Sequence, residues 1–171
     1  MKILFLGAPG SGKSTQGQLL ADESGAKWIS SGQMLRESKE EWIQEKLKTG
    51  ELFDDEFITE MMLGELKSRD DYILDGFPRT KIQAERMLEA GIKLDKIIEI
   101  DVPVEELVKR MLLRGRGEDN EEVIGKRVSI YESTRDDIME VLSRTGLNIE
   151  KVDGMGTMED VYSRVKENLN K

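Results

Sequence analysis

Residues 3–15 read I-L-F-L-G-A-P-G-S-G-K-S-T, an apolar run followed directly by a glycine-rich segment, a lysine and two hydroxyl residues. The apolar run predicts a buried strand, and the glycines predict a tight loop that leads into a helix. In that context the pattern G-x-x-x-x-G-K-[ST] forms a loop whose backbone wraps around the phosphates of a nucleotide. An ordinary glycine-rich turn is the alternative, but such a turn would need neither the lysine nor the hydroxyls.

Each residue type in this loop suits a polyphosphate. The glycines let successive backbone N–H groups point inward toward an anion. Lys13 adds a positive charge near the β- and γ-phosphates, and the hydroxyl of Ser14 or Thr15 can bind Mg²⁺. A helix that begins at Lys13 directs the positive end of its dipole at the same anion. The sequence therefore predicts a site for a nucleoside triphosphate with magnesium.

The composition narrows the chemistry further. The chain contains no Cys and no His, which excludes disulfides, zinc sites of the cysteine–histidine type and histidine acid–base catalysis. Charged residues make up 36% of the chain and its net charge is −9, which argues against a nucleic-acid partner. No apolar run is long enough for a membrane span or a secretory signal, so we expect a cytoplasmic protein. Carboxylates, hydroxyls, Lys and Arg remain, and these groups suit phosphoryl transfer.

Strand-like and helix-like segments alternate along the chain. Short apolar runs predict strands, at 3–6, 28–29, 72–74, 97–100 and 148–152. Apolar residues at helical spacing predict helices, at 18–21, 57–66, 84–88, 107–113 and 123–141. This alternation predicts a single α/β domain over residues 1–171, with a parallel sheet between two layers of helices. Ligands of such folds bind beyond the carboxyl ends of the strands.

Three other features have structural explanations. The cluster Met61, Met62, Leu63 and Leu66 predicts core packing rather than a binding surface. The charged run at 37–48, around Trp42 and Leu47, is typical of a solvated helix face. The segment T-M-E-D at 157–160 predicts a helix start with a capping hydroxyl and an acid three residues later.

A second acidic element follows the apolar run at 72–74. Asp75 ends this strand and can accept hydrogen bonds from Mg²⁺-bound water, while Gly76 turns the backbone and Arg79 leaves the same strand end. Guanidinium groups bind phosphate oxygens in pairs and stay charged when desolvated. Further arginines stand where a polyphosphate would need them, at Arg36, Arg110, Arg114, Arg116 and Arg127. A surface ion pair with one of the 35 acidic residues is the alternative for any one arginine.

Taken in order, these motifs resemble the adenylate kinases, a family of nucleoside monophosphate kinases. The resemblance covers residues 1–169. It rests on G-A-P-G-S-G-K-S-T-Q at 7–16, I-S-S-G-Q-M-L-R at 29–36, Y-I-L-D-G-F-P-R-T at 72–80 with Gln83, D-V-P at 101–103, K-R-M-L-L-R-G-R-G-E-D-N-E-E at 109–122, K-R-V at 126–128 and K-V-D-G at 151–154. It implies an α/β P-loop fold with three layers and a five-stranded parallel sheet of order 2-3-1-4-5. The implied parts are a core at 1–29, 68–113 and 118–171, monophosphate-binding helices at about 30–67 and a vestigial lid at about 114–118.

The resemblance also implies the site residues. ATP would contact the loop, an arginine and a late turn: Gly10, Ser11, Gly12, Lys13, Ser14, Thr15, Arg110, Gly154 and Met155. AMP would contact Ser31, Gly32, Arg36, Leu52, Phe53, Gly76, Arg79 and Gln83, with the two arginines on its phosphate and Ser31 and Gln83 facing its base. The catalytic set would be Lys13, Asp75, Arg79, Arg114, Arg116 and Arg127. The Mg²⁺ ion would bind Ser14 and, through water, Asp75.

The chain departs from the family pattern in three places. G-K-S-T replaces the usual G-K-G-T at 12–15, and Gln33 stands where an Asp is usual. Between Arg114 and Glu118 only G-R-G at 115–117 spans the position of the lid. The lid is therefore nearly deleted, and without Cys it holds no zinc of the usual cysteine type. We expect these residues to form a short, flexible finger around Arg116.

The expected reaction is reversible phosphoryl transfer from Mg-ATP to AMP, giving two ADP, by a monomer whose partners are ATP, AMP and ADP. A UMP/CMP kinase of the same family is the nearest alternative. Ser31 and Gln83 favour AMP, because the Gln83 amide carries both a donor and an acceptor for the adenine edge. A regulatory nucleotide-binding protein without transferase activity is a second alternative, against which the intact arginine set argues. A small-metabolite kinase on the P-loop fold is a third, disfavoured by the motifs at 29–36 and 75–79.

Overall fold

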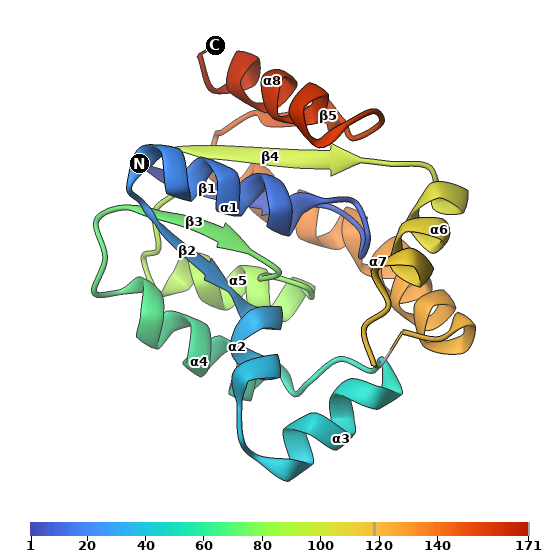
Figure 1. Ribbon diagram of the computed structural model, residues 1–171. Coiled ribbons are helices and arrows are strands. Elements are labelled where there is room, and N and C mark those ends of the chain that lie inside the picture. Colours follow the sequence, from blue (N-terminus) through green and yellow to red (C-terminus); the bar gives the residue numbers. More distant parts are fainter. Residues whose placement is uncertain (118, 171) are drawn as a thin grey trace.

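Five strands form one parallel sheet in the order β2-β3-β1-β4-β5, which confirms the order implied by the family resemblance (Figure 1). The computed structural model describes residues 1–117 and 119–170. Within them the strands are β1 (Lys2–Leu6), β2 (Lys27–Ser30), β3 (Tyr72–Asp75), β4 (Lys96–Asp101) and β5 (Ile149–Asp153). Each strand differs from its predicted apolar run by at most one residue at either end, because backbone pairing continues past the last apolar side chain.

Helices cover both faces of the sheet. The described residues form α1 (Lys13–Ser24), α2 (Ser31–Glu37), α3 (Glu41–Thr49), α4 (Asp55–Leu66), α5 (Lys81–Glu89), α6 (Val104–Arg114), α7 (Glu121–Ser143) and α8 (Met158–Leu169). Helices α1 and α8 pack on one face, and α4 and α5 pack on the other (Figure 1). This arrangement is the predicted three-layer α/β fold.

The central strand β1 shows why the opening apolar run predicts the fold so well. Ile3 and Phe5 pack in the apolar cluster under α1 and α8, whereas Leu4 and Leu6 pack in the cluster under α4 and α5. Successive side chains of a strand point to opposite faces of its sheet. A strand that is covered on both faces must therefore be apolar at every position.

Only Ile43 is buried in the charged segment at 37–48, which agrees with the predicted solvated helix face, but the segment is divided between two helices. Helix α2 ends and α3 begins within it, with extended backbone at Ser38 between them. The side-chain amide of Gln44 donates to Leu35 O, at the end of α2, at 3.1 Å and to Ser38 O at 2.7 Å, which stabilises the end of that helix. Trp42 is 49% exposed, yet its ring packs edge-on against the ring of Phe57, with 5.1 Å between the two ring centroids.

Two other expectations, on core packing and on helix capping, are met. Met62 and Leu66 are buried in the core, and Thr157 and Asp160 form the predicted capping box at the start of α8. In the part of the chain that the structure describes, no helix is both long enough and apolar enough to cross a membrane.

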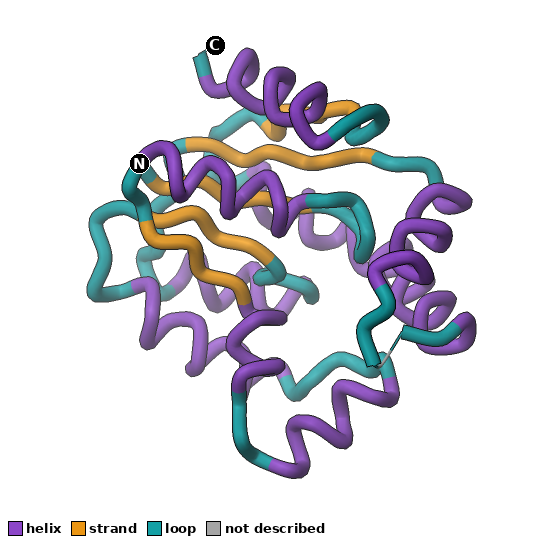
Figure 2. The backbone as a smooth tube through the Cα atoms, viewed as in Figure 1, coloured by secondary structure: helices purple, strands orange, loops and turns teal. Residues whose placement is uncertain are grey.

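The loops that follow β1, β3 and β4 all leave the sheet at the edge where the strands have their carboxyl ends (Figure 2). Helices α2 and α3 project on one side of this edge, and α6 and α7 stand on the other (Figure 1). The fold therefore brings segments from every part of the chain to a single edge, where ligands of open α/β sheets bind.

Candidate active site

The predicted phosphate-binding loop lies between β1 and α1. Gly10 and Gly12 have φ angles of 86° and 92°, which residues with a Cβ atom rarely adopt. A Cβ atom at Gly10 would also lie 2.9 Å from the carbonyl oxygen of Leu107, so the loop lies close against α6. Helix α1 begins at Lys13 without a side-chain cap, which leaves its first amides for an anion.

Lys13 stands among other cations at the start of α1. Its Nζ donates to the carbonyl oxygen of Ala8 at 3.3 Å. Burial is the main cause that lowers the pKa of Lys13 to about 8, and the charges of nearby arginines add to this effect. Asp75 acts in the opposite direction. The loop therefore presents a concentrated positive charge that an anion would relieve.

Asp75 joins β3 to the start of α1. Its Oδ2 accepts from Ser14 Oγ at 2.6 Å and from Ser30 Oγ at 3.1 Å. Its Oδ1 is buried and has no hydrogen-bond partner among the described residues. The described chain offers no group of three or more carboxylates that could hold a metal by itself. The site thus fits an ion that is held partly by a substrate's phosphates and by water, with one carboxylate oxygen left to accept from that water.

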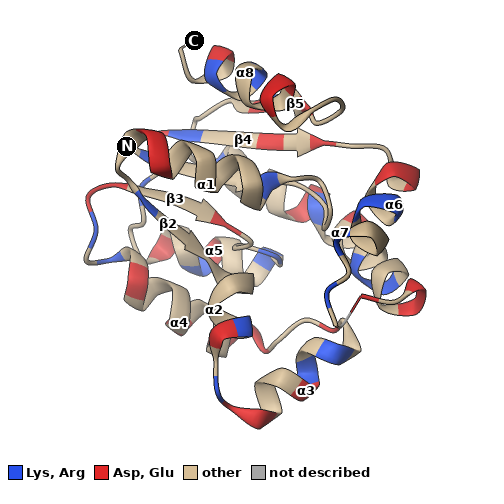
Figure 3. Cartoon of the chain, in the orientation of Figure 1, with Lys and Arg blue, Asp and Glu red and all other residues tan. Residues whose placement is uncertain are grey.

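One cavity of about 380 Å³ lies at this edge of the sheet. In Figure 3, basic segments of α2, α6 and the loop after β3 lie beyond the carboxyl ends of the strands. The cavity brings together most of the site residues predicted from the sequence: Gly10, Gly12, Lys13, Ser14, Thr15, Ser31, Gly32, Arg36, Leu52, Phe53, Asp75, Gly76, Arg79, Gln83, Arg110, Arg114, Arg116 and Arg127.

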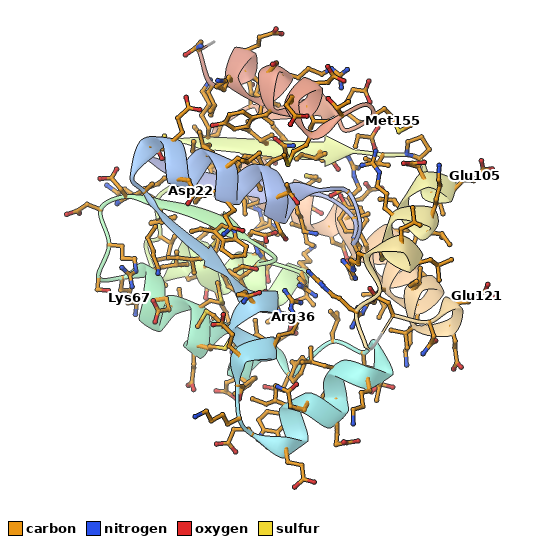
Figure 4. The ribbon with its side chains drawn as sticks, in the orientation of Figure 1. Asp22, Arg36, Lys67, Glu105, Glu121 and Met155 are labelled. Carbon is orange, nitrogen blue, oxygen red and sulfur yellow. The ribbon has the colours of Figure 1, made fainter. Side chains whose placement is uncertain are left out.

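Three predicted residues lie outside the cavity lining. Ser11 is 1% exposed, and its backbone N–H donates to Ala8 O at 3.1 Å. Ser11 therefore stabilises the turn of the loop and is not available to a ligand in the cavity. Gly154 and Met155 follow β5, where Arg110 Nη2 donates to Gly154 O at 3.0 Å. Met155 lies near the start of α6, well away from Arg36 on α2 (Figure 4). Arg110 therefore connects the cavity to this turn.

Two guanidinium groups converge over Gly32. A Cβ atom built at Gly32 would lie 3.2 Å from Arg36 Nη1 and 3.4 Å from Arg79 Nη2. Arg79 Nε also donates to Gly76 O at 2.7 Å, which fixes the direction of its side chain. Burial lowers the pKa of Arg79. The absence of a side chain at Gly32 thus makes room for two positive charges at one place, which suits a second phosphate group.

A buried carboxylate that sequence reasoning missed holds two of the predicted arginines. The side chain of Asp119 has no exposed surface. It accepts from Arg114 Nε at 2.6 Å and Nη2 at 2.9 Å, and from Arg127 Nη1 at 3.1 Å. This acid ties the end of α6 to α7 across the position predicted for the lid. Arg116 lines the cavity beside them, whereas Glu118, the predicted end of the lid, lies outside the described residues.

A second cluster that was not predicted from the sequence joins β4 to α7 at the side of the cavity. Glu99 on β4 is 3% exposed and accepts from Arg135 Nε at 2.5 Å and Nη2 at 2.6 Å. Tyr131 OH donates to the same carboxylate at 3.0 Å, and the hydrogen bond from Arg135 to Glu99 is the main cause that raises the pKa of Arg135. Tyr131 and Arg135 both line the cavity. The sequence contains one indication of this cluster, a lone Glu inside the apolar strand K-I-I-E-I-D, because a charge that is buried in a strand needs a partner.

Comparison with known proteins agrees with this geometry. A model of the adenylate kinase family matches residues 5–147. The chain is 38% identical to the adenylate kinase of Thermus thermophilus, over 98% of this chain and 96% of that protein. It is 38% identical to the adenylate kinase of Mycobacteroides abscessus over the whole of both chains, and 36% identical to that of Parabacteroides distasonis over 99% of this chain and 98% of that one. This chain therefore belongs to the adenylate kinase family.

Proposed function

We propose that this chain catalyses the reversible transfer of a phosphoryl group from Mg-ATP to AMP, giving two ADP. The observation that carries the proposal is the pair of cationic clusters in one cavity, with the loop and Lys13 forming one and Arg36 with Arg79 forming the other. Two cationic clusters suit the phosphates of two separate nucleotides, whereas a protein that senses one nucleotide would need only one such cluster. Membership of the adenylate kinase family supports the same reaction.

The phosphates of ATP belong, in this proposal, at the loop amides and Lys13. Thr15, in the first turn of α1, lines the same cavity. The adenine of ATP would lie against Arg110 and the turn at Gly154 and Met155. Arg110 suits this role because Glu106 holds its Nε at 2.9 Å and Gly154 O holds its Nη2 at 3.0 Å. A planar guanidinium fixed in this way is a surface on which an aromatic base can stack.

The monophosphate would bind between Arg36 and Arg79, over Gly32. Its base would extend toward Gln83, with the segment at 52–53 as an apolar boundary. Ser31 Oγ donates to Gly76 O at 2.5 Å, which holds the start of α2 against the loop after β3. This contact supports a structural part for both residues in shaping the acceptor site.

Transfer itself requires alignment and positive charge more than proton abstraction. Arg114 and Arg127 are held in place by Asp119, and Arg116 lines the cavity beside them. Together they would neutralise the charge on the moving phosphoryl group. Magnesium, which Ser14 and a water on Asp75 would hold, supplies further neutralisation between the phosphates when bound. The unpartnered Oδ1 of Asp75 supports this assignment.

We further propose that the protein works as a cytoplasmic monomer on small nucleotides. The net charge of −9 supports nucleotide substrates over polymeric nucleic acid, because the general field repels a long polyanion. A group of arginines and Lys13 nevertheless lines the cavity, where a small anion can reach it.

A coupled assay of ADP formation from ATP with AMP, UMP, CMP or GMP tests the function. We expect AMP to give the highest kcat/KM. Lys13→Ala should lower kcat/KM with AMP by roughly 10²- to 10⁴-fold, with an unchanged circular dichroism spectrum. A preference for UMP or CMP would support the pyrimidine kinase instead. Tight ATP binding without turnover on any monophosphate would support a regulatory protein.

A further inference from the structure

The side-chain amide of Gln83 is held in one orientation by two hydrogen bonds inside the protein. Its Oε1 accepts from the backbone N–H of Arg79 at 2.8 Å. Its Nε2 donates to Asp55 Oδ1 at 2.9 Å. An amide has two N–H groups and two oxygen lone pairs, so these bonds use half of its capacity. One donor and one acceptor remain on a side chain that lines the cavity.

A third residue fixes the direction of these bonds. Thr80 Oγ1 accepts from the backbone N–H of Gln83 at 3.2 Å and donates its hydrogen to Asp55 Oδ1 at 2.7 Å. The Asp55 oxygen is therefore an acceptor for both neighbours, as an ionised carboxylate must be. The side chains of Thr80 and Gln83, at the start of α5, both donate hydrogen bonds to Asp55, at the start of α4.

A reversed Gln83 amide would lose both bonds. Its Oε1 would face the carboxylate of Asp55, acceptor against acceptor, and its Nε2 would face the Arg79 N–H, donor against donor. The backbone N–H cannot change its character, and neither can an ionised carboxylate. The orientation is thus set by chemistry, and it determines which side of the amide offers the free acceptor and which offers the free donor.

We propose that Asp55 is a positioning residue for base selection, acting through Gln83. The inference rests on the proposed function, in which the acceptor base lies at Gln83. Adenine carries an amino donor beside a ring acceptor, whereas guanine and hypoxanthine carry a carbonyl acceptor in place of that amino group. An amide fixed in one orientation matches the first pattern and opposes the second. An amide free to turn over would accept either pattern.

The test compares AMP with IMP, which differ at the base only in this donor–acceptor pattern. Asp55→Ala removes the acceptor that holds Nε2, and Asp55→Asn can present an N–H to a reversed amide. We expect the ratio of kcat/KM for AMP to that for IMP to fall by roughly threefold to tenfold in either variant, the factor one hydrogen bond is worth. The KM for ATP should not change. The Arg79 N–H remains, so preference should weaken without inverting.

Glu56→Gln is the matched control, since Glu56 and Asp55 are both acids in the first turn of α4. Both substitutions remove one favourable charge at that helix end. Asp55→Ala also removes two hydrogen bonds, so we expect it to melt at a somewhat lower temperature than Glu56→Gln. Only the Asp55 variants should change the AMP/IMP ratio. In a Gln83→Ala background, Asp55→Ala should leave the ratio unchanged, because the residue through which it acts is gone.

An AMP/IMP ratio that stays within twofold of wild type in both Asp55 variants overturns the inference. So does an Asp55→Ala effect that persists in the Gln83→Ala background. Neither result bears on the reaction itself, which wild-type turnover of ATP with AMP decides independently.

Discussion

Ser14 Oγ donates to Asp75 Oδ2 at 2.6 Å, and this bond joins the start of α1 to the carboxyl end of β3. A helix start that would bind phosphates is thereby fixed relative to a carboxylate that would orient magnesium. Ser30 Oγ donates to the same oxygen from the end of β2. Three segments that are distant in the sequence thus meet at one carboxylate, whose other oxygen faces no partner among the described residues.

Asp75→Asn tests this arrangement. The substitution keeps the size of the side chain but removes the charge that would hold a metal-bound water. We expect kcat to fall by roughly 10- to 100-fold and the Mg²⁺ concentration for half-maximal activity to rise, as is usual when a residue that orients metal-bound groups is changed. The melting temperature without nucleotide should change little, since Asn can still accept from Ser14. Asp70→Asn, at an exposed acid before β3, is the control. A normal Mg²⁺ dependence of Asp75→Asn would contradict the assignment.

The pKa of Lys13 predicts a proton linkage. In the free protein this pKa is about 8, lowered mainly by burial. Bound phosphates favour the charged form and raise the pKa. Near pH 8.5 the free lysine is therefore mostly neutral, and binding of ATP must be accompanied by proton uptake. The affinity for ATP should accordingly weaken as the pH rises above 8.

Titration calorimetry at pH 8.5, in two buffers of different ionisation enthalpy, measures this uptake. Lys13→Arg is the matched variant, because a guanidinium stays charged at this pH. It should bind ATP with less proton uptake than wild type. Equal uptake in the two proteins would show that Lys13 is already fully charged before ATP binds.

Most of the fold could be predicted from the sequence, for a physical reason visible in β1. A strand covered on both faces must be apolar throughout, so Ile3, Leu4, Phe5 and Leu6 mark it clearly. The segment at 37–48 was harder to predict. Its helix break is stabilised by the side chain of Gln44, and no Gly or Pro marks the position.

The site was predictable where a motif fixes a residue's neighbours, as in the loop before Lys13. It was not predictable where a contact joins distant residues. Glu99 can be recognised as a lone charge inside an apolar strand, but nothing in the sequence identifies Arg135, on a distant helix, as its partner. Asp119 looks like one more acid in a charged run, and only its burial against Arg114 and Arg127 distinguishes it.

The convergence of Arg36 and Arg79 over Gly32 predicts a specific kinetic defect. Arg36→Ala and Arg79→Ala should each raise the KM for AMP by roughly 10- to 100-fold, because each removes charge-assisted hydrogen bonds to the monophosphate. The KM for ATP should change far less. Steady-state kinetics with each substrate varied in turn measures the difference, and Arg144→Ala, at a half-exposed arginine on the far end of α7, is the control. Equal effects on both KM values would argue against a separate acceptor site.

Asp119→Ala should affect stability and turnover together. The carboxylate is fully buried and accepts hydrogen bonds from both Arg114 and Arg127, so its removal takes away the counter-charge that these two cations share. Loss of one partner from a buried ion pair costs about 3–5 kcal/mol of unfolding free energy. We expect chemical denaturation to show a loss of that order and kcat to fall. Asp136→Ala, at an acid whose side chain is 92% exposed, should change neither. A stable Asp119→Ala with normal kcat would mean that the two arginines need no anchor.

The short connection between α6 and α7 leads to the last prediction. Arg116 lines the cavity, and its charge contributes to the lowered pKa of Lys13 and of Arg79. Arg116→Lys should lower kcat by roughly tenfold, since an ammonium cannot reproduce the planar fork of a guanidinium, and Arg116→Ala should lower it further. Lys109→Ala, at an exposed lysine one turn back on α6, is the control.

The same short connection offers little to exclude water from the cavity. We therefore expect measurable hydrolysis of ATP in the absence of AMP, and a kcat that does not respond to solvent viscosity, because no large lid has to open before products leave. Phosphate release without AMP and kcat in graded sucrose measure these two properties. A viscosity-dependent kcat would show that a slow opening step limits turnover in spite of the short connection. If Arg116→Lys and Arg116→Ala both turned over like wild type, Arg114 and Arg127 would be sufficient to neutralise the transferring group.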